Sequence, residues 1–246
     1  MRSTLVAAWL LAVSVASADT KIVYVAQGGA GAATVLYVAG GRMRLELPDA
    51  ESGYALFDAA AQTLVSVDPD TRTYAPLEPA TIGRLTAQLA ADQLALGDAL
   101  EGATPEQRAQ VERMLGKTAV AVATPVVTRT RERTTVGGYD CEVLRYEVAG
   151  QRGKVCVAAS KSFGLSTSDE STLARFKAFA DRMAVQAFPS GAGPGVRLVE
   201  ISGMPAGWKH ADLPASVARR VSHDTLPTSL FVVPSDYRRE PLPSIR

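Results

Sequence analysis

Histidine and cysteine are scarce in this chain, which has two of each among its 246 residues. Structural and catalytic zinc sites take most of their ligands from these residue types at short spacings such as C-x-x-C, and no such spacing is present. We therefore expect no bound metal ion.

Motifs for covalent catalysis are missing as well. No G-x-S-x-G elbow occurs in the sequence. Ser222-His223-Asp224 supplies the residue types of a catalytic triad, but neighbours on a strand point to alternate faces and cannot form the relay. The other histidine, His210, follows Trp208 near a predicted turn. We interpret both histidines as surface or structural residues, predict no catalytic residue, and expect a protein that is not an enzyme.

No apolar run is long enough for a transmembrane helix, which needs about 20 residues. The apolar residues 5–13 follow the basic Arg2 and precede three small residues, 16–18, an order typical of a secretory signal. We predict that residues 1–18 are a signal peptide cleaved between Ala18 and Asp19, with an uncleaved N-terminal anchor as the alternative. The mature protein is then expected to be periplasmic or secreted and soluble.

Excess charge of one sign is also lacking. Of the 26 basic residues only Arg2 lies within residues 1–18, which leaves 25 basic against 25 acidic residues in the mature chain. This balance gives no electrostatic attraction to nucleic acid, so no nucleic-acid partner is expected. Arg129, Arg131 and Arg133 form a local basic row, which we interpret as the solvent-facing charge of an edge strand.

A glycine-rich run at residues 28–33 follows a β-branched segment, as in dinucleotide-binding turns. Such a turn opens a helix, whereas residues 34–38 are β-branched and aromatic and residues 42–47 alternate between apolar and polar. The run is therefore interpreted as a hairpin loop, and no cofactor is expected.

The first third of the mature chain has the pattern of an antiparallel meander. Strand-like segments recur about every ten residues and are closed by turn residues. They are residues 21–26, 34–38, 42–47, 54–57, 63–67 and 72–77. The short connections require antiparallel pairing, because parallel strands need long crossovers.

A helical insertion is predicted over about 81–116. The apolar residues Ile82, Leu85, Leu89, Leu96 and Leu100 recur at helical spacing. A capping box with proline at its second position, residues 104–107, begins a second helix that Gly116 ends. These helices are either a lid over a ligand or ordinary core packing, and a leucine stripe fits both.

The second half of the chain predicts more strands around one helix. Strands are expected at residues 120–124, 126–130, 196–202, 207–210, 216–222 and 230–234. Ser168-Asp169-Glu170 precede a predicted helix that carries an apolar stripe. Its members are Leu173, Phe176, Ala180, Met183 and Ala187, with Phe179 beside them. The tail, 238–246, is expected to be frayed.

Both cysteines lie in a predicted hairpin at residues 137–158. If residues 149 and 150 form the turn, Cys156 faces Val143 and Cys141 faces Ala158. In an oxidising compartment the two cysteines are expected to form a disulfide. Because they are diagonal to each other, we expect a bulge or a shifted turn to bring them opposite.

Four segments resemble a family of exported bacterial domains of unknown function that is grouped with the LolA/LolB-like periplasmic lipoprotein carriers. They are GGYDCE (137–142), KVCVA (154–158), ISGMP (201–205) and LPTSLFVVPSDY (226–237). The resemblance implies one α+β domain over residues 19–237, a curved antiparallel half-open β-barrel with helices covering its concave face. In the carriers that shape accepts acyl chains.

Two functions follow from these observations. The first is a non-catalytic periplasmic protein that binds a lipid, a lipoprotein acyl chain or another apolar ligand between sheet and helices. Its predicted contacts are Leu85, Leu89, Leu96, Phe176, Phe179 and Met183. The alternative is an interaction module with a self-filled core that docks an envelope protein, and a hydrolase is a distant third.

Overall fold

The computed structural model describes residues 19–27, 33–47, 53–78, 81, 83, 84, 87, 91, 104, 106, 126–148, 151–187, 201–210 and 215–240. The proposed signal peptide, the predicted strand at 120–124 and most of the proposed helical insertion and of the predicted strand at 196–202 lie outside these residues. Within the insertion, Thr81, Gly83, Arg84, Ala87, Ala91 and Glu106 are helical. No helix in the described part of the chain has the length and apolar character of a membrane span.

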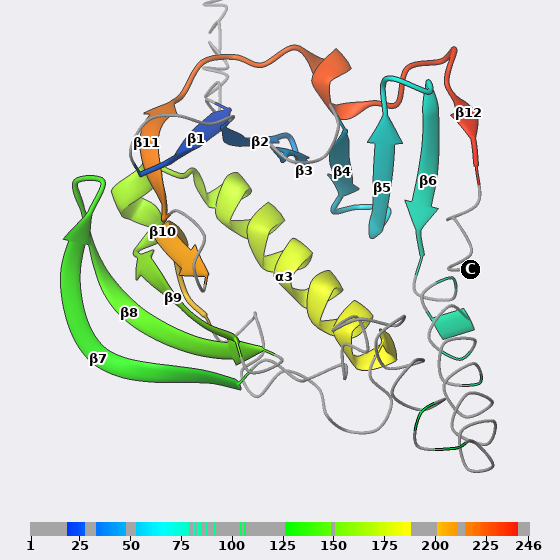
Figure 1. Cartoon of the computed structure of the whole chain (residues 1–246). Coiled ribbons are helices and arrows are strands. Elements are labelled where there is room, and N and C mark those ends of the chain that lie inside the picture. The colour runs from blue at the N-terminus through cyan, green and yellow to red at the C-terminus, as the bar shows by residue number, and fades with distance from the viewer. Residues whose placement is uncertain are drawn as a thin grey trace, which may run out of the picture.

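Twelve strands form one sheet in the order β12-β6-β5-β4-β3-β2-β1-β11-β10-β9-β8-β7 (Figure 1). In chain order they are β1 (Thr20–Ala26), β2 (Thr34–Ala39), β3 (Arg42–Glu46), β4 (Tyr54–Asp58), β5 (Thr63–Asp68), β6 (Thr73–Leu77), β7 (Val126–Val136), β8 (Tyr139–Val148), β9 (Gln151–Ala158), β10 (Met204–His210), β11 (Ser216–Ser222) and β12 (Arg238–Arg239). All neighbours pair antiparallel except β12 and β6, which are parallel. The expected antiparallel sheet is confirmed. Its edge strands β7 and β12 do not pair in the described residues, so the sheet is not closed.

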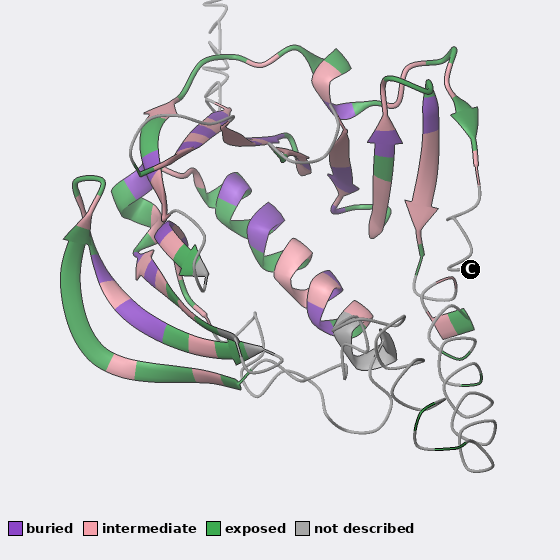
Figure 2. Ribbon diagram, viewed as in Figure 1, coloured by how far each residue is buried: buried purple, intermediate pink, exposed green. Residues whose placement is uncertain are grey.

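Helix α3 (Thr167–Ala187) lies across one face of this sheet and buries the side of the helix that faces the strands (Figure 2). Ile22 and Tyr24 alternate with outward-facing residues along β1 and join the same buried cluster as Phe179 of the helix. At the start of the helix the Ser166 amide donates to Asp169 Oδ2 at 3.2 Å, and the Asp169 amide donates to Ser166 Oγ at 3.1 Å. This reciprocal cap begins the helix at Thr167, a few residues before the predicted start, so Ser168, Asp169 and Glu170 lie in its first turn.

The predicted disulfide is confirmed, whereas the expected bulge is wrong. Cys141 pairs with Ala158 and Val143 with Cys156, without a register shift between β8 and β9. The cysteines are thus diagonal, yet their Cα atoms are 5.4 Å apart and the sulfurs are bonded. The right-handed twist of neighbouring strands shortens one diagonal, so no bulge is needed.

The C-terminal segment differs from the expectation. The predicted strand at 230–234 is instead the 3-10 turn η4 (Thr228–Phe231) followed by non-strand residues, because Pro227 and Pro234 lack the amide that a ladder needs. The start of the tail is not frayed: the Arg238 amide donates to the Arg72 carbonyl at 2.9 Å and the Glu240 amide to the Tyr74 carbonyl at 2.8 Å. These bonds place β12 at the edge of the sheet.

Candidate functional site

Half of the predicted ligand contacts are described: Phe179 lies in the core, and Phe176 and Met183 are partly buried against it. Phe179 is 1% exposed, and its ring centroid is 5.4 Å from that of Phe57. Phe176 lies 5.3 Å from the same ring, and Met183 packs against the same cluster. The remaining three, Leu85, Leu89 and Leu96, lie outside the described residues. None of the pockets described below is lined by Phe176, Phe179 or Met183.

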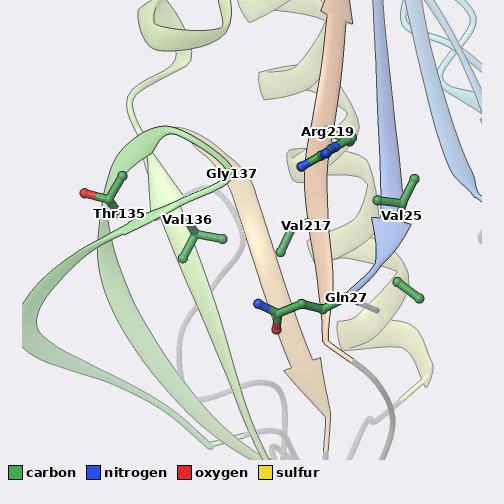
Figure 3. Close-up of a pocket in the computed structure, with 8 residues that line it drawn as sticks. Val25, Gln27, Thr135, Val136, Gly137, Val217 and Arg219 are labelled. Carbon is green, nitrogen blue, oxygen red and sulfur yellow. The ribbon is translucent and has the colours of Figure 1, made fainter. Parts of the chain in front are cut away.

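The tip of the β7–β8 hairpin lies over β10 and β11, and helix α3 is behind β11 in the same view (Figure 3). The tip, Gly137-Gly138, has φ values of +60° and +88°, a conformation that favours glycine. A Cβ atom at Gly137 would clash with the carbonyl oxygen of Ala218 in β11. One residue earlier, Val136 lies against Gly207 of β10, where a Cβ atom would be 2.8 Å from the valine. Glycines at both positions therefore let the hairpin rest directly on β10 and β11.

A pocket of about 420 Å³ lies under the hairpin tip (Figure 3). In Figure 3 Val136 of the hairpin and Val217 of β11 lie on facing sides of it, and Val25 of β1 lies beyond them. The remaining lining residues are Ala26, Gln27, Thr135, Gly137 and Arg219. The two facing sides of this pocket are thus aliphatic, and polar side chains complete its lining.

A second pocket of about 290 Å³ continues the first, because Gln27, Val136 and Val217 line both. It runs over β8, β9 and β10, where its floor includes Val143, Cys156 and Gly207. Its other lining residues are Glu132, Thr134, Lys154, Val155, Trp208, Lys209, Ala215 and Ser216. We call the two adjoining pockets the hairpin groove.

A third pocket, also about 290 Å³, adjoins the groove and is basic. Its lining residues are Arg145, Arg152, Gly153, Lys154 and Lys209. Lys154 and Lys209 line both this basic pocket and the groove. The hairpin groove therefore adjoins a group of positively charged side chains.

Tyr146 braces the strands behind the basic pocket. It is paired with Gly153, and its ring occupies the space where a side chain at that position would be. Its hydroxyl donates to the Lys209 carbonyl at 3.5 Å. Burial raises the pKa of Tyr146, so the phenol stays protonated and keeps this donor at neutral pH.

The histidine whose side chain the structure describes lies apart from the groove. His223 is exposed, and its Nδ1 atom is 3.4 Å from the Thr20 hydroxyl, which donates to the Asp169 carboxylate at 2.9 Å. Among the described residues no group of histidine, cysteine, aspartate and glutamate is arranged to hold a metal ion.

The groove and the basic pocket were not predicted from the sequence. One signal was present: the predicted β8–β9 register already places Arg145 opposite Lys154. Like charges at facing positions are unfavourable, and such departures from local rules are typical of functional or strained sites. The bending of the hairpin over β11 has no comparable local signal.

The contact between Gly137 and β11 predicts unequal effects of alanine at the two tip glycines. Both substitutions strain a positive-φ residue, which costs about 1–2 kcal/mol. Gly137→Ala is expected to cost about 1–3 kcal/mol more, because its Cβ meets the Ala218 carbonyl, whereas nothing lies within 4 Å of a Cβ at Gly138. Urea unfolding of both variants measures the difference, and equal losses would show that the tip does not rest on β11.

No protein-family model matches the chain, and no curated protein matches it. Two solved structures of PNGF-II, in space groups C2 and P21, match the chain distantly. The first matches at 9% identity with a TM-score of 0.44, covering 92% of this chain and 31% of that one. The second matches at 9% identity with a TM-score of 0.42, covering 91% and 31%. The chain spans about a third of the PNGF-II chain, and a likeness this distant carries no argument about activity.

Proposed function

We propose that this is an exported, non-catalytic protein that binds a lipid, an acyl chain or a similar apolar ligand, and that the ligand lies in the hairpin groove. The observation that carries the proposal is that Val136 and Val143 of the hairpin and Val25 and Val217 of β1 and β11 line two adjoining pockets. Concave, mostly apolar pockets with a few polar groups at their rim are where proteins bind small ligands. The disulfide fits an oxidising compartment, and we propose the periplasm.

The half-open barrel implied by the resemblance is part of the same proposal. Its support is that one buried cluster joins helix α3 to strands from both halves of the sheet. The groove shares Val143 and Cys156 with that cluster, but none of the predicted contacts Phe176, Phe179 and Met183 lines it, so it differs from the site predicted between sheet and helices.

The alternative function, docking of an envelope protein, would use the exposed edge of β7. That edge is interrupted by a register shift between Arg129 and Arg133, with Arg131 at φ +61°. The Thr130 hydroxyl donates to the Val143 carbonyl at 2.7 Å within this irregularity. A bulge and a row of charges make a strand edge a poor template for another strand, so we favour ligand binding.

Titration with a fluorescent fatty-acid analogue tests the groove. Val217→Glu places a charge in the aliphatic wall and is expected to weaken binding at least about tenfold. The matched control is Val126→Glu, at a 57% exposed position of β7 outside the groove, which is expected to leave affinity unchanged. Leu89→Glu tests the site predicted from the sequence. Loss of binding in that variant alone, with Val217→Glu unaffected, would place the ligand on the helix side and overturn the groove assignment.

A further inference from the structure

Three cationic residues face one another across three strands at the end of the groove. Lys154 of β9 is paired with Arg145 of β8 on one side and with Lys209 of β10 on the other. Directly opposite residues in a sheet have Cβ atoms about 4.5–5.5 Å apart, and like charges there are destabilising.

Acidic neighbours neutralise only part of this charge. A guanidinium nitrogen of Arg145 lies 3.5 Å from the Glu132 carboxylate, and Arg152 lies 3.1 Å from the Glu147 carboxylate. Within the described part of the chain no ion pair includes Lys154 or Lys209. The basic pocket therefore presents two ammonium groups that form no ion pair with any described carboxylate, and an anion bound there would relieve their repulsion.

The apolar floor of the groove begins two residues from the cations on each strand. Val143 and Gly207 both pair with Cys156, and Arg145, Lys154 and Lys209 follow at the next positions on the same face. Two residues of a strand span about 7 Å. A ligand that fills both regions must therefore be charged at one end and apolar within a few bonds of it.

We propose that the groove's ligand is a single-chain amphiphile with a phosphate headgroup, which binds Lys154 and Lys209 while its chain runs toward Val136 and Val217. This inference rests on the proposed function, because it needs the groove to be the binding site. Two ammonium groups match a phosphate monoester, whose charge is about −1.5 to −2 at neutral pH. Hydrogen bonds between ammonium and phosphate are charge-assisted and stronger than neutral ones.

Isothermal titration with dodecyl phosphate and with dodecylphosphocholine, both below their micellar concentrations, tests the headgroup assignment. The two probes share the chain and the phosphate, but the second carries a compensating cation. We expect dodecyl phosphate to bind at least about tenfold more tightly, because loss of charge-assisted contacts costs roughly 1.4 kcal/mol or more. Added salt is expected to weaken only dodecyl phosphate, since the lysines are exposed.

The variant Lys154→Gln/Lys209→Gln is expected to abolish the preference for dodecyl phosphate. Its affinity for dodecylphosphocholine is expected to stay within about threefold of the wild-type affinity. Glutamine keeps most of the aliphatic stem that lines the groove. The matched control, Lys161→Gln/Arg220→Gln, removes the same charge at exposed positions that line none of the three pockets. Because two facing cations are removed, the melting temperature of the lysine variant is expected to stay equal or rise.

The outcomes separate the two levels of the proposal. If neither dodecyl probe binds the wild-type protein, the proposed function fails. If both bind equally, and Val217→Glu abolishes both, the groove binds a chain but the headgroup assignment is overturned. If inorganic phosphate alone binds as tightly as dodecyl phosphate, the alkyl chain contributes nothing to binding. The site then binds an anion, and the assignment of an amphiphilic ligand is overturned.

Discussion

Phe179→Ala is expected to lower the free energy of unfolding by about 3–5 kcal/mol, among the larger losses that a single truncation causes. Its side chain is 1% exposed and lies between helix α3 and the sheet. The ring contacts that of Phe57 at 5.4 Å, an interaction that adds to the area it buries. Truncation leaves a cavity whose walls belong to two different elements, so the neighbours can collapse into it only in part. Urea unfolding followed by circular dichroism measures the loss.

Val232→Ala is the matched control, because it removes apolar atoms at a position that is 46% exposed. Its effect is expected to stay within about 0.5 kcal/mol. A loss below about 1 kcal/mol for Phe179→Ala would contradict the close packing of α3 on the sheet.

The same pair of variants separates the two candidate ligand sites. If the ligand occupies the hairpin groove, the folded fraction of Phe179→Ala keeps its affinity for the fatty-acid analogue. If the ligand lies between sheet and helices, as the sequence predicts, affinity falls together with stability. Affinity is measured without urea and at a temperature well below the thermal unfolding transition of Phe179→Ala, where the variant is folded; this distinguishes the two outcomes.

Most strands could be predicted from the sequence, because their signals are local. The six strands of the meander agree with the expected segments to within one residue at each boundary, and β11 has the expected range, 216–222. Alternation between apolar and polar residues fixes which face is buried, and the turn residues fix where each strand ends. Helix α3 could be predicted for the same reason, since its apolar stripe and its capping residues lie within one segment of the sequence.

The errors arise where a distant part of the chain decides the local structure. Residues 230–233 are apolar enough for a strand, yet the flanking Pro227 and Pro234 favour the turn η4. The pairing of β12 with β6 joins residues more than 160 positions apart and has no signal in either segment. β7 extends six residues beyond its predicted end because β8 pairs along its length, across the irregularity at Arg131.

The candidate site likewise depends on contacts between segments that are distant in the sequence. The sequence places Val143 opposite Cys156 and Arg145 opposite Lys154, but the third row, Gly207 and Lys209, depends on how β10 pairs with β9. The groove's roof depends further on the hairpin tip meeting β11. The predicted β8–β9 hairpin contains four of the five residues that line the basic pocket, but nothing in the local sequence predicts how the groove beside it is enclosed.

Removal of the disulfide is the second large effect that we expect. The bond joins residues 15 positions apart, and closing a loop of that length stabilises the folded state by about 3 kcal/mol, chiefly by restricting the unfolded chain. Both cysteines are buried, Cys141 at 4% and Cys156 at 6% exposure. Alanine is therefore the suitable replacement, because a serine hydroxyl would add the cost of a buried polar group.

The double variant Cys141→Ala/Cys156→Ala should unfold at a lower urea concentration than the oxidised wild type, by an amount that corresponds to about 3 kcal/mol. Dithiothreitol should bring the wild type close to the variant and leave the variant itself unchanged, which identifies the bond as the cause. A loss below about 1 kcal/mol would show that the β8–β9 hairpin holds its register without the bond. Because Val143, Arg145 and Lys154 all lie between the two cysteines, the same register places the groove's apolar floor beside its cations. The preference for dodecyl phosphate over dodecylphosphocholine should accordingly persist in the folded variant, since the strand pairing supplies that geometry and the disulfide only stabilises it.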